Sequence, residues 1–176
     1  PGQNTTGLCP TVRFSGDPVY LPDEAPVADE VAQRIETYWR PYHEALRDEL
    51  DRLREIHGRV LLWEGHSIRG ECPFLFDGRL PDLNIGTASG TSCIPGTQHR
   101  IETALQAQSD YGWVINGRFK GGHITRHYGD PANGIDAVQL EIAQRIYMDE
   151  ASFEYDASLA AKAQQAIHDL IVAALG

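Results

Sequence analysis

The sequence has few cysteines and no long apolar run. Its three cysteines, Cys9, Cys72 and Cys93, are odd in number and form no CxxC pair, so neither a disulfide framework nor a zinc knuckle is predicted. We expect each thiol to be a small buried hydrophobic group in a protein of the reducing cytoplasm. No stretch approaches the roughly 20 apolar residues that a membrane-spanning helix needs, so no membrane partner is expected.

Positive charge is scarce as well. The chain has 15 Lys and Arg against 25 Asp and Glu, which gives a formal net charge of −10. Nucleic acids and anionic membranes attract basic surfaces, and we therefore expect neither as a general partner. The first ten residues, PGQNTTGLCP, have no initiator methionine and the features of neither a signal peptide nor a transit peptide, so we expect an internal start.

What the sequence does have is the composition of a globular domain. Of its 176 residues, 41% are hydrophobic and 23% are charged, and a chain of this length can close a core. We predict a single domain spanning residues 1–176. Apolar residues recur every three or four positions from 27 to 56, which indicates an amphipathic helix. Pro41 should kink or split this helix near Trp39, and Gly58 should end it.

Short apolar segments alternate with helical ones over the rest of the chain. The continuous run Val60–Trp63 predicts a strand buried on both faces. Further strands are predicted at 83–85, 113–115 and 138–142, with an edge strand at 123–127. A short helix is expected around Ile101 and Leu105, and a final helix is expected to begin at a Ser158 cap. No internal repeat is present, and the predicted class is α/β, with a mixed sheet flanked by helices.

The first candidate functional residue is His66, which follows the apolar strand directly. In an open α/β sheet, ligands bind beyond the carboxyl ends of the strands, and neutral imidazole is a favoured zinc ligand. A histidine that only bonds a loop carbonyl would fit the same position. The HExxH motif is absent, so residue spacing leaves both interpretations open.

A second candidate is the basic stretch NGRFKGGHITRHYG at 116–129. It contains Arg118, Lys120 and Arg126 and no acidic residue, although the chain as a whole is acidic. Arginine binds a carboxylate with two parallel hydrogen bonds, so we favour a site for a small anion here. The GxxxxGK[ST] phosphate loop is absent. The alternative is a solvated loop whose arginines pair with the surplus carboxylates.

The third candidate is Glu141, in the alternating segment at 138–142. Alternation places Gln139 and Glu141 on one face of a strand and three apolar residues on the other. A carboxylate facing inward must be paired, bound to a metal or shifted in pKa, because burying it unpaired is costly. An exposed edge strand with a solvated Glu141 is the other possibility, and the spacing does not decide between them.

Seven segments together carry a family resemblance. They are PGQNTTGLCP at the start, YWRPYH at 38–43, HSIR at 66–69, GRLPDLNIGT at 78–87, NGRFKGG at 116–122, ITRHYG at 124–129 and QLE at 139–141. With these motifs in this order, from residue 1 to about Glu150, the sequence resembles the N-formylglutamate amidohydrolase family of histidine degradation.

The resemblance implies a zinc-carboxypeptidase-like α/β fold and the hydrolysis of N-formyl-L-glutamate to L-glutamate and formate. It implies one divalent zinc ion per site, with His66 as a ligand and Glu141 as the catalytic carboxylate. The expected partner is a small dicarboxylate substrate. Residues expected to contact the substrate are Arg69, Arg118, Lys120, Thr125 and Arg126. Arg69 or Arg118 would stabilise the tetrahedral oxyanion.

The sequence departs from the family pattern in two places. Members carry a preceding segment that supplies the other metal ligands and a strand, so the resemblance implies that this chain is a C-terminal portion, partnered by that N-terminal segment. Glu64-Gly65 replaces the usual Asp-containing text before the histidine. Two alternatives stay open: another zinc-dependent N-acyl-amino-acid deacylase, or a truncated, non-catalytic domain that binds carboxylates. We expect no complete three-ligand zinc site within the chain itself.

Overall fold

A computed structural model describes residues 7–176, and the motif residues Pro1–Thr6 lie outside it. The chain divides into two compact units, one formed by Pro1–Glu49 with Glu71–Gly78 and the other by Leu50–Gly70 with Arg79–Gly176. The expectation of a single domain over the whole chain stays a prediction. No helix in the described part combines the length and the apolar character that crossing a membrane requires.

The first unit contains α1 (Ala28–Arg34), the π-helical turn η1 (Ile35–Trp39) and the start of α2 (Arg40–His57). The interruption expected near Trp39 is this π-helical turn, in which the amide of Arg40 bonds the carbonyl of Ile35. Pro41 follows at once, and a proline has no N–H to continue the usual helical ladder. Prolines and π-helical turns are both features at which helices kink.

The second unit is built on a mixed sheet with the strand order β1-β4-β2-β3. The strands are β1 (Val60–Ile68), β2 (Leu83–Gly86), β3 (Trp113–Ile115) and β4 (Ile135–Ala143). The pair β1 and β4 is parallel, as is the pair β2 and β3, whereas β2 and β4 are antiparallel. The predicted α/β class with a mixed sheet is therefore confirmed.

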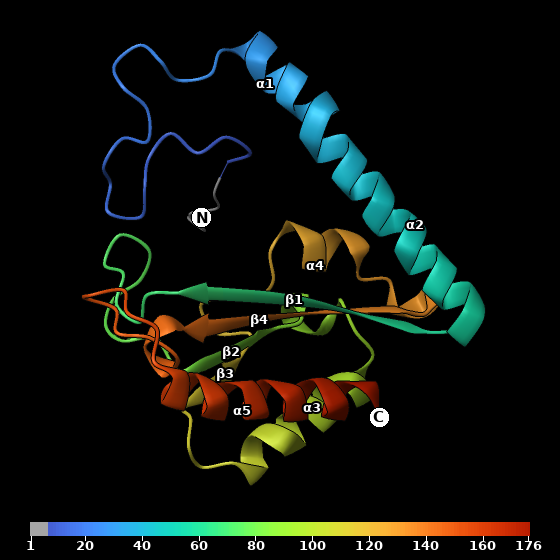
Figure 1. The fold of residues 1–176 in the computed structure, drawn as a ribbon. Coiled ribbons are helices and arrows are strands. Elements are labelled where there is room, and N and C mark those ends of the chain that lie inside the picture. The colour runs from blue at the N-terminus through green and yellow to red at the C-terminus, as the bar shows by residue number, and fades with distance from the viewer. Residues whose placement is uncertain (1–6) are drawn as a thin grey trace. The chain divides into compact units, whose positions relative to one another are not determined.

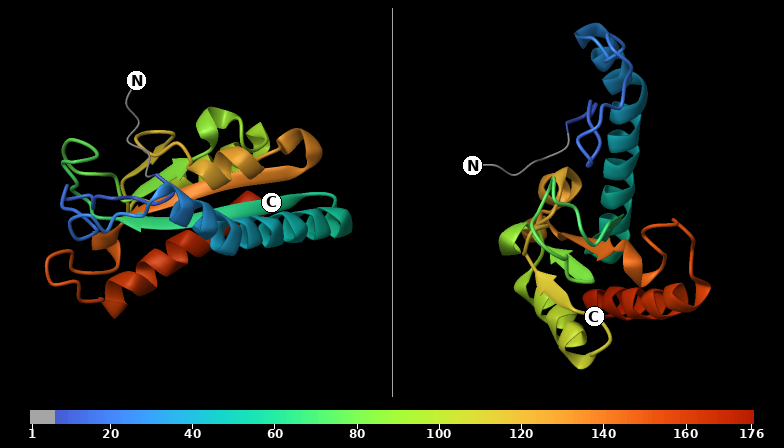
Figure 2. Two further views of the ribbon diagram at one scale, coloured as in Figure 1. Left: turned by 90° about the horizontal axis from the view of Figure 1, so that it is seen from above. Right: turned by 90° about the vertical axis from the view of Figure 1, so that its left-hand side faces the viewer.

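Helices cover the two faces of this sheet differently. Figure 1 shows α3 (Pro95–Ala107) and α5 (Ala157–Leu175) on one face and the short α4 (His123–Tyr128) on the other, an arrangement also visible in Figure 2. Short 3-10 turns connect the elements: η2 (Ala88–Gly90), η3 (Pro131–Asn133) and η4 (Gln144–Ile146). The two-helix face holds the core, and the α4 face is left for polar side chains.

The core forms because the apolar positions of β2 and β4 point to the two-helix face. Its buried members include Leu83, Ile85, Val138, Leu140, Ile142, Ile101, Leu105, Ala163 and Leu170. Cys93 also belongs to this cluster, and burial raises the pKa of its thiol to about 11, so it is a packing residue as expected. Cys72 is buried too, whereas Cys9 is only half-buried. The prediction that all three cysteines are buried was therefore wrong for Cys9.

Three local predictions were wrong. Residues 123–127 form the helix α4, because the amide of Arg126 bonds the carbonyl of Gly122 and the helix buries Thr125 and Tyr128, three apart, against the sheet. The strand at Val60 is only half-buried, since β4 is its single strand neighbour among the described residues. The cap of α5 is Asp156, whose carboxylate accepts from the amides of residues 158 and 159.

A buried carboxylate ties β4 to α3. Asp136 accepts hydrogen bonds from Arg59 Nη2 at 2.9 Å and from the Ile94 amide at 3.0 Å on Oδ1, and from Thr97 Oγ1 at 2.7 Å on Oδ2. Asp136→Ala would leave the amide and the hydroxyl without an acceptor inside the protein. We expect a loss of about 2–3 kcal/mol in the free energy of unfolding, measured by urea denaturation.

Asp136→Asn is the matched variant, because it keeps an acceptor oxygen and removes the charge. It should retain more stability than Asp136→Ala. Arg59→Ala should cost less than either, since the Arg59 side chain is half-exposed and can be replaced by water. A loss below about 0.5 kcal/mol in Asp136→Ala would show that this network does not stabilise the fold.

Candidate active site

Four polar side chains form an array on the α4 face of the sheet. Glu64 and His66 lie two apart on β1, and Gln139 and Glu141 lie two apart on β4, so each pair shares a face. The parallel register pairs Glu64 with Gln139 and His66 with Glu141. The predicted metal ligand and the predicted catalytic carboxylate, far apart in sequence, are therefore direct neighbours in the sheet.

The β1 half of the array is a hydrogen-bonded chain. His66 Nε2 lies 2.9 Å from Glu64 Oε1, and the Thr125 hydroxyl donates to Glu64 Oε2 at 2.5 Å. Burial opposes ionisation of Glu64, but the hydrogen bonds from His66 and Thr125 outweigh it and lower the pKa of this carboxyl. The same bond to Glu64 raises the pKa of His66 against the effect of its own burial. Glu64 therefore favours a charged imidazole.

In the β4 half, the pKa of the carboxyl group is shifted in the opposite direction. Glu141 is only 7% exposed, so the interpretation as a solvated edge carboxylate was wrong. Burial raises its pKa to about 7, the nearby His66 opposes this shift, and Glu64 adds to it. Such a carboxyl can both accept and return a proton near neutral pH, which is what a general acid-base catalyst requires.

The backbone of Glu141 is held by a buried amide on the next strand. Asn84 is paired with Glu141 in the antiparallel register and is 1% exposed. Its Nδ2 donates to the carbonyls of Glu141 at 3.0 Å and Pro81 at 2.9 Å. Its Oδ1 is buried and accepts no hydrogen bond in the part of the chain that the structure describes.

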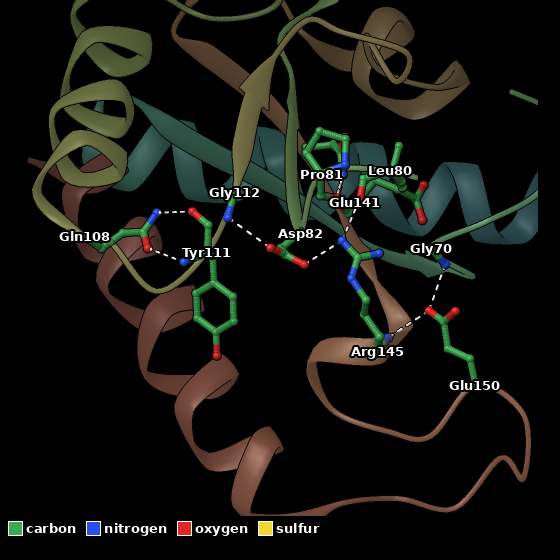
Figure 3. Close-up of polar contacts among 11 residues, drawn as sticks. Gly70, Leu80, Pro81, Asp82, Gln108, Tyr111, Gly112, Glu141, Arg145 and Glu150 are labelled. Atoms are coloured by element: carbon green, nitrogen blue, oxygen red, sulfur yellow. Dashed lines mark hydrogen bonds and ion pairs between the residues drawn. The ribbon is translucent and has the colours of Figure 1, made fainter. Parts of the chain in front are cut away.

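Arg145 joins the ends of neighbouring strands, as Figure 3 shows. Arg145, which follows β4, donates from Nη2 to Asp82 Oδ1 and to the Leu80 carbonyl, both at 2.6 Å. Asp82 Oδ2 in turn accepts from the Gly112 amide at 2.9 Å, just before β3. The starts of β2 and β3 are thus fixed relative to the end of β4, and this supports the position of Glu141 on that strand.

The basic loop at 116–122 packs backbone to backbone against the end of β2. A Cβ at Gly86 would lie 2.5 Å from the Gly121 amide nitrogen, so the loop approaches as closely as glycine allows. Asn116, in the left-handed region with φ +53°, accepts from the amide of Thr87 on its Oδ1. The Gly122 amide donates to Gln139 Oε1 at 2.6 Å, which joins the loop to the array.

The predicted substrate-binding residues are distributed unevenly around this array. Thr125 is fully buried, and its hydroxyl is engaged with Glu64. Arg118 is half-buried beside the Phe119 ring, and exposed Arg126 donates to the Gly121 carbonyl. Lys120 and Arg69 are both exposed. The loop and α4 thus carry three cations close in sequence to Gly122 and Thr125, which contact the array, and the contacts of these cations with a substrate stay a prediction.

Within the described residues, the array does not include the ligand set of a metal site. No group of three His, Cys, Asp or Glu side chains in residues 7–176 is arranged to hold a metal ion. His66 is a suitable donor, but its Nε2 faces Glu64 rather than a cluster of ligands. The described residues alone do not form a zinc site, since such a site takes three or four protein ligands.

Comparison with known proteins gives the family. A family model described as N-formylglutamate amidohydrolase matches residues 1–148. The chain belongs to the N-formylglutamate amidohydrolase family. This confirms the family that the seven motifs indicated.

Two curated members are close in sequence. The N-formylglutamate deformylase of Pseudomonas putida is 51% identical over 172 residues, which are 97% of this chain and 64% of that protein. The N-formylglutamate deformylase of Pseudomonas aeruginosa is 50% identical over 168 residues, 95% of this chain and 63% of that protein. The chain thus spans less than two thirds of the length of either relative.

A solved family member has the same fold. The crystal structure of N-formylglutamate amidohydrolase from Ralstonia eutropha JMP134 superposes with a TM-score of 0.70 at 28% sequence identity. The match covers 87% of this chain and 56% of that one. The mixed sheet with its flanking helices is therefore the architecture of the N-formylglutamate amidohydrolase family.

Sequence reasoning overlooked three residues that support the site: Asn84, Asn116 and Arg145. Asn84 and Asn116 lie in family motifs, and Asn84 could have been noticed as an amide between two apolar residues of a buried strand. A buried amide must be hydrogen-bonded, so its presence there indicates a partner across the sheet. Nothing in the local sequence of Arg145 indicates that it reaches back to Asp82.

The close approach at Gly86 gives a prediction for the loop. Gly86→Ala would place a methyl group 2.5 Å from the Gly121 nitrogen and 2.6 Å from the Lys120 carbonyl carbon, and neither backbone atom can move without shifting the loop. We expect a loss of about 1–3 kcal/mol in the free energy of unfolding, with amide chemical shifts changing mainly at 116–122. Gly65→Ala is the control, since a Cβ there meets nothing within 4 Å. Equal effects of the two variants would contradict the packing argument.

Proposed function

We propose that this chain carries the proton-transfer half of a site that hydrolyses N-formyl-L-glutamate to L-glutamate and formate. The observation that carries the proposal is Glu141, a buried carboxyl with a pKa of about 7 paired across the sheet with His66. The chain's 50–51% identity to two proteins named N-formylglutamate deformylase supports the substrate.

Glu141 is proposed to act as base and then as acid. It accepts a proton from the water that attacks the formyl carbon, and it then donates that proton to the amide nitrogen as the C–N bond breaks. The products are formate and the free amino group of glutamate, and Glu141 returns to its ionised form. A pKa near 7 suits both transfers, because neither protonation state is strongly disfavoured at neutral pH.

The substrate's two carboxylates are proposed to bind the cations of the basic loop at 116–122 and of α4. Arg118 and Arg126 can each offer a planar pair of N–H donors, and Lys120 adds a third positive charge. Backbone contacts of the glycines with β2 and Gln139 hold this loop beside the array. A dicarboxylate is therefore preferred over a neutral formyl amide.

We also propose a divalent zinc ion, with His66 as one ligand and the others from outside the described residues. Zinc would supply a Lewis acid that polarises the formyl carbonyl. Glu64, which bonds His66, would orient the imidazole as carboxylates do for metal-binding histidines.

The test is release of the free amino acid by the protein in its full natural length, since every substrate compared gives this product and only the formyl substrates give formate. N-formyl-L-glutamate should give the largest kcat/KM, with N-acetyl- and N-succinyl-L-glutamate and N-formyl-L-leucine as comparisons. A preference for a larger acyl group would favour another deacylase. A failure to discriminate glutamate from leucine would contradict the carboxylate-binding loop.

Arg126→Lys, on α4, tests this carboxylate binding in the same assay. The change keeps the positive charge but removes the planar pair of donors, so KM for N-formyl-L-glutamate should rise by about tenfold with little change in kcat. Arg54→Lys is the control, because Arg54 pairs with Asp51 on α2 and lies against the opposite end of β4. A large fall in thermal stability with unchanged KM would identify Arg126 as a structural residue.

A further inference from the structure

The exposed surface of α4 carries two histidines one helical turn apart. His123 and His127 are both exposed, and their rings stack with centroids 5.0 Å apart and planes within 14°. Positions i and i+4 of a helix lie one above the other, so both imidazoles belong to one face. The opposite face buries Thr125, which bonds Glu64. The histidine pair is therefore on a different face of α4 from the polar array.

We propose that His123 and His127 together bind one divalent transition-metal ion on the outer face of α4. Imidazole nitrogen suits zinc, copper and nickel ions, and two histidines at i and i+4 of a helix are the arrangement that holds zinc in the HExxH motif. This site uses neither His66 nor the proposed hydrolytic reaction. Water completes the coordination, as it does wherever a protein offers only part of a ligand set.

Metal binding requires the two imidazoles to turn from their stacked positions. Metal–nitrogen distances of about 2.0–2.1 Å place two tetrahedral ligand nitrogens roughly 3.4 Å apart, and the ring centroids are 5.0 Å apart. Rotating the imidazoles about their side-chain bonds turns one nitrogen of each toward a common point. His127 also packs edge-on against Tyr128, with centroids 4.9 Å apart, and this limits the rotamers it can adopt.

The charge close to the pair in sequence does not favour a cation, because the stretch at 116–129 contains Arg118, Lys120 and Arg126 and no acidic residue. The affinity must therefore come from the two imidazole ligands. Arg126 lies between the two histidines in sequence and would repel a metal, but its guanidinium is bonded back to the Gly121 carbonyl. With two protein ligands the site is weaker than a three- or four-ligand zinc site, and copper should bind more tightly than zinc.

The experiment is a copper(II) titration of the EDTA-treated, ¹⁵N-labelled protein at pH 7.5. Paramagnetic broadening should appear first at the amides of residues 122–128. Zinc chloride, followed by calorimetry, should bind at the same place, and either ion should raise the melting temperature by mass action. His123→Ala and His127→Ala should each weaken copper binding by about tenfold or more, and the double variant should abolish broadening at α4.

Three controls locate the site. His57→Ala and His168→Ala remove exposed histidines that have no histidine one turn away, and both should leave the titration unchanged. His66→Ala should leave the broadening at residues 122–128 intact. Unchanged affinity in the double variant, or a single variant as strong as the parent, would overturn the proposal. The Glu64 and Thr125 amide shifts in the metal-free variants report whether α4 is still folded.

Discussion

Replacing Glu141 with glutamine is expected to lower kcat for formate release by about 10²–10⁴-fold. Glutamine has nearly the same shape and fills the same space on β4, but it cannot accept the proton of the attacking water. Substrate binding should change little, because the basic loop and not Glu141 holds the carboxylates in this proposal, so KM is expected to stay within a few-fold. The measurement is steady-state formate release by the protein in its full natural length.

Glu64→Gln distinguishes the two carboxyls of the array. Glu64 is the partner of His66 and has a lowered pKa, so it stays ionised and is poorly suited to carry a proton. Its loss should disturb the imidazole and reduce kcat less than the loss of Glu141. A larger defect in Glu64→Gln than in Glu141→Gln would exchange their roles. Near-normal kcat in Glu141→Gln would remove the general base from this strand.

The strands that carry the array could be predicted because their pattern is local. Alternation alone placed Gln139 and Glu141 on one face of β4, and the apolar run located β1. The pairing of His66 with Glu141 could not be read in this way, since it depends on β1 and β4 being neighbours in a particular register. The family resemblance assigned His66 and Glu141 to one site, which residue spacing could not do.

The burial of Glu141 could not be predicted for a related reason. A strand with alternating polar residues suits an exposed face as well as a polar site. Tertiary structure decides whether Glu141 is buried. In the sheet, β4 lies between β1 and β2, and α4 lies over the polar face. The raised pKa, the most informative property of the site, follows from that tertiary burial.

The segment at 123–127 shows the reverse error, in which a local pattern was misread. An edge strand was predicted here, but Thr125 and Tyr128 are the pair that packs inward, at helical spacing. The helix matters because it lets Thr125 reach Glu64 and stacks His123 on His127. In a segment this short, a helix and a strand predict almost the same buried positions, and one buried residue distinguishes them.

The burial of Glu141 also predicts how stability depends on pH in the EDTA-treated protein. Its pKa is about 7 in the folded state against an ordinary value of 4.5, so the folded protein binds this proton more tightly than the unfolded chain. The contribution is fully present below pH 4.5 and is lost as the pH rises to about 7. Above pH 7 the buried charge lowers the free energy of unfolding by at most about 3–4 kcal/mol, since each pKa unit corresponds to about 1.4 kcal/mol.

Glu141→Gln should therefore be more stable than the parent at pH 8 and equal to it near pH 4.5, as measured by urea denaturation at both values. His66, whose pKa is raised, loses its own stabilising contribution as the pH rises above 6.5, but both proteins contain it and most of its effect cancels in the difference. Glu55→Gln, on an exposed position of α2, should show no such divergence. A stability difference that is the same at both pH values would mean that glutamine acts through packing, and the pKa of Glu141 would then not be raised by burial.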